Sequence, residues 1–96
     1  MWVVVTYDVC TQDREGRRRL SRVARACEGY GQRVQDSVFE CQIDETSWAK
    51  LRARLLALIR PEVDSLRFYH LGEVPSGRNE HHGVRPTRDL EGPLIF

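Results

Sequence analysis

The chain has 96 residues, of which 41% are hydrophobic and 30% are charged, a composition typical of one small globular domain. No apolar run is long enough to span a bilayer, and the start at Met1-Trp2 lacks the basic leader of a secretory signal, so we expect a cytoplasmic protein that makes no membrane contact. The formal net charge of +1 combines 15 basic and 14 acidic side chains, so only the distribution of charge can indicate a nucleic-acid partner.

The first predicted element is a strand from Trp2 to Tyr7, an almost continuous run of β-branched and aromatic residues that ends on Asp8. A strand end is a rigid position from which to present a carboxylate, and Mg²⁺ prefers hard oxygen ligands. An acid at this position is also typical of a side chain that caps the next helix or stabilises a turn. From the sequence alone this capping or turn-stabilising role is the default, and the metal-binding role is the alternative.

From Asp13 onward the apolar spacing becomes helical, and Gly29 and Gly31 mark the end of this first helix. One face is predicted to be buried, with Leu20, Val23, Ala24 and Cys27. The opposite face carries an arginine stripe within an arc of about 80°, formed by Arg14, Arg18, Arg22 and Arg25. Guanidinium groups bind phosphate bidentately, so the stripe suits a nucleic-acid backbone. An ordinary solvated face is the alternative, but Arg17 and Arg19 add density that favours phosphate binding.

The segment from Gln32 to Ile43 is β-like, with a turn predicted at Asp36-Ser37 between two short strands. One continuous bent strand is the alternative. A second helix, capped by Thr46 or Ser47, is predicted up to Pro61. Its helically spaced apolar residues are Trp48, Leu51, Leu55, Leu58 and Ile59.

A final core strand is predicted from Ser65 to Leu71, which completes the order β-α-β-β-α-β. This order predicts an α+β fold, the ferredoxin-like sandwich, over residues 1–72. Residues 73–96 form a predicted C-terminal extension, in which the polar stretch from Val74 to Asp89 is expected to be an exposed connection without regular structure. The apolar end, Leu94 to Phe96, is expected to dock on a sheet edge of a second subunit.

The scarcity of acids near Asp8 limits any metal chemistry. Asp13 and Glu15 lie on a different predicted element, and two-metal sites with ions about 3.5 to 4 Å apart need more carboxylates than this. A two-fold dimer could supply a second Asp8, and Mg²⁺ would relieve the repulsion between the two carboxylates. Such a site could polarise a phosphodiester, although its nuclease activity should be slow.

Cysteine and histidine residues show no catalytic pattern. Three cysteines, an odd number without CxxC spacing, argue against a disulfide framework and a structural zinc site. The pair His81-His82 and His70 lack an acid or cysteine at metal-ligand spacing, so structural roles are favoured for all three.

Three runs of residues carry a resemblance to a known family. They are Tyr7-Asp8-Val9, Gly16 to Leu20, and Gly29 to Cys41, in which Val34 to Glu40 is the most specific part. Over about residues 1–71 the chain closely resembles the CRISPR-associated protein 2 family, the small subunit of the spacer-acquisition complex. The resemblance implies a ferredoxin-like homodimer in which Asp8 of both subunits binds one Mg²⁺, as metal ligand and catalytic residue of an endonuclease acting on single-stranded RNA or double-stranded DNA.

The same resemblance implies an alternative function, a non-catalytic adaptor that bridges two dimers of the CRISPR integrase subunit (Cas-one). Arg14, Arg17 and Arg18 would then hold the middle of the protospacer duplex, with Arg22 of the same stripe as a further nucleic-acid contact. The integrase would perform the cutting and joining, and Asp8 could be dispensable. A third possibility is a toxin-like ribonuclease that needs no integrase partner.

Overall fold

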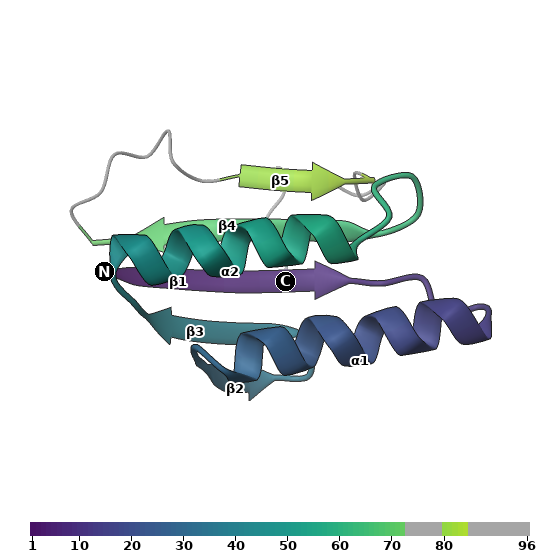
Figure 1. The fold of residues 1–96 in the computed structure, drawn as a ribbon, viewed down its shortest axis with the longest axis horizontal. Coiled ribbons are helices and arrows are strands. Elements are labelled where there is room, and N and C mark those ends of the chain that lie inside the picture. The colour runs from purple at the N-terminus through teal and green to yellow at the C-terminus, as the bar shows by residue number, and fades with distance from the viewer. Residues whose placement is uncertain (73–79, 85–96) are drawn as a thin grey trace.

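The computed structural model describes residues 1–72 and 80–84. Along the described chain the elements are β1 (Trp2–Asp8), α1 (Arg14–Glu28), β2 (Gln32–Gln35), β3 (Val38–Gln42), α2 (Glu45–Leu58), β4 (Ser65–Leu71) and β5 (Glu80–Gly83). The strands form one antiparallel sheet in the order β2-β3-β1-β4-β5, and both helices cover the same face of it (Figure 1). The first four strands and two helices have the predicted ferredoxin-like order, and the α+β fold class is confirmed.

Alternation along the central strand decides which side chains enter the core. In β1 the buried positions are Val3, Val5 and Tyr7, which face the helices, because side chains two residues apart share a face of the sheet. Trp2 and Asp8 have the opposite parity and are exposed. The helix-free face of the sheet therefore carries both the first and the last side chain of β1.

The helix starts are set by aspartates. Asp13 caps α1 by accepting a hydrogen bond from the backbone N–H of Gly16 at 2.8 Å, and Asp44 caps α2 by accepting one from Ser47 at 2.7 Å. The prediction that Thr46 or Ser47 caps the second helix was wrong. A cap must reach an N–H two or three residues further along, and Asp44 lies at that distance from Ser47.

The expectation that Val74 to Asp89 has no regular structure was wrong for Glu80–Gly83, which forms β5 on the edge of β4. Glu80 accepts hydrogen bonds from Arg52 of α2, the shortest at 2.8 Å, and lies 2.7 Å from Nε2 of His82. These long-range contacts hold a strand whose own sequence has low β-propensity. The predicted docking segment, Leu94 to Phe96, lies outside the described residues, so its pairing with a second subunit stays a prediction.

Among the described residues, no helix has the length and apolar character needed to cross a membrane.

Candidate functional site

Asp8 is the last residue of β1, the central strand of the sheet, and is exposed. It pairs in the antiparallel register with Ser65, the first residue of β4. Asp13 caps α1, so the helix-capping part of the default interpretation of Asp8 was wrong. Its carboxylate instead stands at the rigid end of a central strand, where it can meet a ligand.

The described residues, 1–72 and 80–84, contain no group of three or more His, Cys, Asp or Glu side chains able to hold a metal ion. A single carboxylate is nevertheless a hard oxygen ligand of the kind that Mg²⁺ takes together with water and phosphate oxygens. Asp8 therefore fits a Mg²⁺ site that is completed by ligands from outside one chain, namely a second copy or a nucleic acid.

The four arginines predicted to bind nucleic acid are all exposed on α1: Arg14, Arg17, Arg18 and Arg22. The end of β1 and the beginning of α1 lie at the same edge of the molecule (Figure 1). The first turns of the arginine helix therefore start near the strand end that carries Asp8. Of these arginines, Arg17 donates a hydrogen bond to the carbonyl of Thr11 at 3.4 Å, close to the limit of such a bond, so its guanidinium keeps donors for a phosphate.

Arg19 differs from its neighbours, because it is only 7% exposed. Its Nε donates to Oδ2 of Asp64 at 2.8 Å, and its Nη2 donates to Oδ1 at 3.2 Å. The expectation that Arg19 adds to a phosphate-binding surface was wrong. Helical residues three or four apart lie on the same face, so position 19 falls on the buried face and not on the arginine stripe. Arg19 shares its face with Gly16 and Val23, which are also buried.

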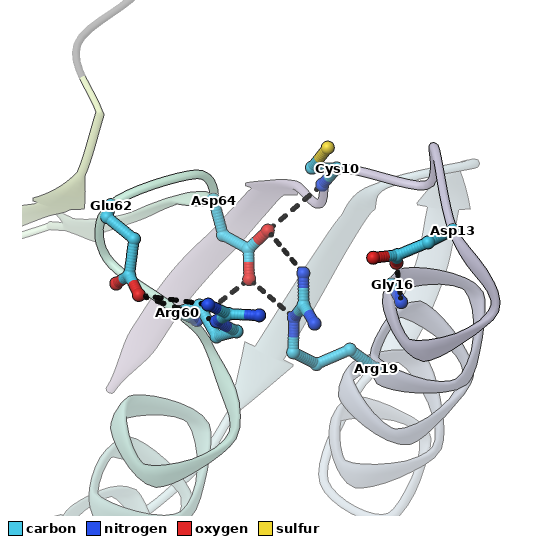
Figure 2. A network of polar contacts seen from close by, with 7 residues as sticks. All are labelled: Cys10, Asp13, Gly16, Arg19, Arg60, Glu62 and Asp64. Carbon is cyan, nitrogen blue, oxygen red and sulfur yellow. Dashed lines mark hydrogen bonds and ion pairs between the residues drawn. The ribbon is translucent and has the colours of Figure 1, made fainter.

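Asp64 is the functional candidate that the sequence interpretation missed. It is fully buried in the connection before β4, and Figure 2 shows its carboxylate between three segments of the chain. Besides Arg19 it accepts hydrogen bonds from the backbone N–H of Cys10 at 2.9 Å and of Arg60 at 2.8 Å. Burial acts to raise the pKa of Asp64, but the hydrogen bonds from Arg19, Arg60 and Cys10 outweigh it and lower the pKa. The carboxylate is therefore ionised and saturated with donors.

Comparison with known proteins identifies the family. The sequence profile of the family described as CRISPR associated protein Cas2 matches residues 1–78. The chain belongs to the Cas2 family. The CRISPR-associated endoribonuclease Cas2 of Chlorobaculum tepidum is 58% identical over 96 residues, which is 100% of both chains. The CRISPR-associated endonuclease Cas2 of Halalkalibacterium halodurans is 52% identical over 100% of both chains.

A solved structure of the Cas2 family has the same fold. The crystal structure of Streptococcus pyogenes Cas2 at pH 6.5 aligns with a TM-score of 0.70 and 49% identity, covering 76% of this chain and 88% of that one. The family resemblance found in the sequence is thereby confirmed.

Two of the three cysteines of this Cas2 family member offer no nucleophile at neutral pH. Cys27 and Cys41 are buried, and burial raises the pKa of the Cys27 thiol to about 12 and that of Cys41 to about 11. Both thiols therefore stay protonated.

The histidines have packing roles. His70 is buried with its ring 5.6 Å from that of Trp48, and His82 packs at 5.7 Å from Phe68. His81 contacts the Ser65 hydroxyl at 3.1 Å. These contacts fit the structural roles favoured by the sequence.

An open pocket of about 420 Å³ is lined in part by Glu28, Glu40 and Trp2. Trp2 and Glu28 are at the opposite ends of β1 and α1 from Asp8 and the helix start. The carboxylates of Glu28 and Glu40 in the pocket wall would repel a phosphate, so this pocket is a poor candidate for the Cas2 nucleic-acid site.

Proposed function

We propose that this Cas2 family member is a cytoplasmic CRISPR spacer-acquisition protein and a Mg²⁺-dependent endonuclease. As a homodimer it hydrolyses phosphodiester bonds of single-stranded RNA or double-stranded DNA. The observation that carries the proposal is the exposed Asp8 carboxylate at the end of β1, at the edge where the arginine helix begins. The endoribonuclease and endonuclease names of relatives 58% and 52% identical support it.

The helix-free face of the sheet supports a homodimer. Trp2 and Leu71 are 44% and 48% exposed and lie directly opposite one another in the pairing of β1 with β4. Tyr69, on the same face of β4, is also exposed. Two copies related by a two-fold axis would bury these apolar side chains against each other. Because Asp8 shares this face, an axis near the end of β1 would bring the two carboxylates together.

The proposed chemistry divides between the acids and the arginines. Mg²⁺ bound by the two Asp8 carboxylates would supply charge neutralisation and polarisation of a phosphodiester. Arg14, Arg17 and Arg18 would hold flanking phosphates through charge-assisted hydrogen bonds and orient the backbone at the strand end. One acid from each subunit provides fewer carboxylate ligands than a two-metal nuclease site has, so we expect slow turnover.

The alternative function is a non-catalytic adaptor that bridges dimers of the CRISPR integrase (Cas-one) on a protospacer duplex. The exposed arginines of α1, set against the single carboxylate at the strand end, support it. Backbone contacts of this kind give sequence-independent binding, as an adaptor needs. In this function Asp8 can be replaced without loss of spacer acquisition.

The deciding experiment compares wild type with Asp8→Asn for cleavage of labelled single-stranded RNA and double-stranded DNA, with Mg²⁺ and with a chelator. Glu28→Gln is the matched control, because Glu28 is an exposed acid at the far end of α1. Loss of Mg²⁺-dependent cleavage in Asp8→Asn alone, with the dimer intact by sedimentation, supports the nuclease. Equal cleavage in all three proteins contradicts it, and integrase-dependent spacer acquisition by Asp8→Asn would then establish the adaptor.

A further inference from the structure

We propose that Asp64 is a positioning residue that fixes the Asp8 strand end relative to the arginine helix. The inference rests on the proposed function, because it concerns how the two halves of that site are held together. Asp64 itself is fully buried, so it acts through the residues it contacts.

Asp64 holds the strand end from two directions. Through the chain it is joined to Ser65, which pairs with Asp8 in the antiparallel register. Through its side chain it accepts a hydrogen bond from the N–H of Cys10 at 2.9 Å, two residues beyond Asp8. Asp64 therefore fixes both the pairing partner of Asp8, which is Ser65, and the backbone at Cys10. These two contacts set the direction of the Asp8 backbone.

The same side chain fixes α1. Arg19 forms its two hydrogen bonds with Asp64 from the inner face of the helix. The first turn of α1 also packs against Cys10, because a Cβ added at Gly16 would lie 1.9 Å from the Cys10 carbonyl oxygen. Cys10 thus donates its N–H to Asp64, and its carbonyl lies against the first turn of α1. Arg17 and Arg18 lie between the Gly16 and Arg19 contacts on α1, and Arg14 lies two residues before Gly16 in the first turn.

The backbone of Asp64 is also held by hydrogen bonds. Its N–H donates to the carbonyl of Arg60 at 2.8 Å, and its own carbonyl accepts from Val84 at 2.8 Å. The neighbouring Gly83 has φ +101, and a Cβ there would lie 1.9 Å from the Asp64 carbonyl oxygen. The carboxylate is therefore presented from a connection that is closed by a turn at Arg60 and tied to the end of β5.

The energetics favour positioning over stability as the reason for this arrangement. A buried ion pair loses the hydration of two charges, and well-packed apolar residues of similar volume often stabilise a core as well or better. Apolar residues cannot, however, accept the N–H of Cys10 and the guanidinium of Arg19 at once. An ionised carboxylate with several donors fixes directions as well as distances.

The test separates positioning from stability with two double variants. Arg19→Met/Asp64→Leu removes both charges and every acceptor of the Asp64 side chain. Arg19→Met/Asp64→Asn also removes both charges but keeps an amide oxygen that can accept from Cys10. Three properties are measured in wild type and both variants: the unfolding midpoint, amide hydrogen exchange of Cys10 without metal, and binding of Mg²⁺ alone by calorimetry.

We expect both variants to fold. In the Leu variant Cys10 should exchange at least about tenfold faster and Mg²⁺ should bind about 10- to 100-fold more weakly, as when partners of metal ligands are removed. In the Asn variant both properties should return toward wild type. Mg²⁺ affinity that does not follow Cys10 protection across the three proteins overturns the inference, as does a folded Leu variant with wild-type exchange and affinity.

Failure of the proposed function has a different signature. A wild type that binds no Mg²⁺ overturns the proposed metal site. Amide exchange of Cys10 needs no metal, so this measurement alone then tests the positioning role. Faster exchange in the Leu variant than in the Asn variant supports that role. The same exchange rate in both variants as in wild type overturns it.

Discussion

Asp8 lies opposite Ser65 in the pairing of β1 with β4, so the exposed Asp8 and the fully buried Asp64 are one residue out of register. The two acids have opposite surroundings within this short distance. Asp8 faces solvent on the helix-free side, whereas Asp64 receives hydrogen bonds from Cys10, Arg19 and Arg60. One carboxylate is available to a ligand, and the other is committed to the fold.

The first prediction concerns the stability carried by this buried pair. Asp64→Ala leaves Arg19 buried with an unpaired charge, so the free energy of unfolding should fall by about 3–5 kcal/mol. Urea denaturation monitored by circular dichroism measures the loss. Arg60→Ala is the control, because the Arg60 side chain pairs with exposed Glu62 at 3.3 Å and the loss of an exposed pair should cost much less. Equal losses in the two variants would contradict the prediction.

The second prediction concerns the exposed arginines. Arg18→Ala/Arg22→Ala removes two candidate phosphate contacts, so binding to duplex DNA should weaken similarly for all sequences. The slope of log K against log salt should fall by about 2. Lys50→Ala/Arg54→Ala is the charge-matched control, because both residues are exposed on α2. Fluorescence anisotropy over a range of salt concentrations measures both slopes, and a slope that falls equally in both variants would show a general effect of net charge.

The third prediction concerns the docking of β5 at acidic pH. Hydrogen bonds from Arg52 lower the pKa of Glu80 from 4.5 to about 2, with a smaller contribution from His82. An undocked Glu80 would titrate near 4.5. Between these values the undocked strand binds the extra proton, so the contribution of Glu80 to docking is complete above pH 4.5 and is lost as the pH falls toward 2.

Carboxyl NMR titration checks this pH dependence. In Arg52→Ala the Glu80 pKa should move back toward 4.5, and β5 amides should exchange faster at neutral pH. Arg54→Ala is the control on the same helix, with an exposed side chain. A Glu80 pKa that is the same in wild type and Arg52→Ala would exclude Arg52 as the cause.

These contacts explain which parts of the structure the sequence could predict. The strands from Trp2 and Ser65 and the helix from Asp13 follow from local composition and periodicity. β5 could not be found in this way, because it depends on the pairing of Glu80 with Arg52, which is 28 residues away. The same holds for Asp64, which contacts Arg19 across 45 residues. Helical spacing could have identified Arg19 as buried, since it shares a face with Val23.

The fourth prediction concerns the helix-free face and the completeness of the metal site. Leu71→Glu places a charge beside Trp2 on this face, so the proposed dimer should dissociate. Because each subunit offers one Asp8, Mg²⁺ binding should weaken together with dimerisation. Sedimentation and calorimetry on the same samples measure the two properties, and Ala53→Glu, which adds the same charge at an exposed position of α2, should leave both unchanged.

The relation between dimerisation and Mg²⁺ binding distinguishes two kinds of site. If Mg²⁺ affinity falls in proportion to the dimer population, the ion needs a carboxylate from each subunit, as two-fold symmetry allows. A monomeric Leu71→Glu protein with wild-type Mg²⁺ affinity would mean that the site is complete within one subunit. The second Asp8 would then have no role in holding the metal, and the exposed face would serve assembly alone.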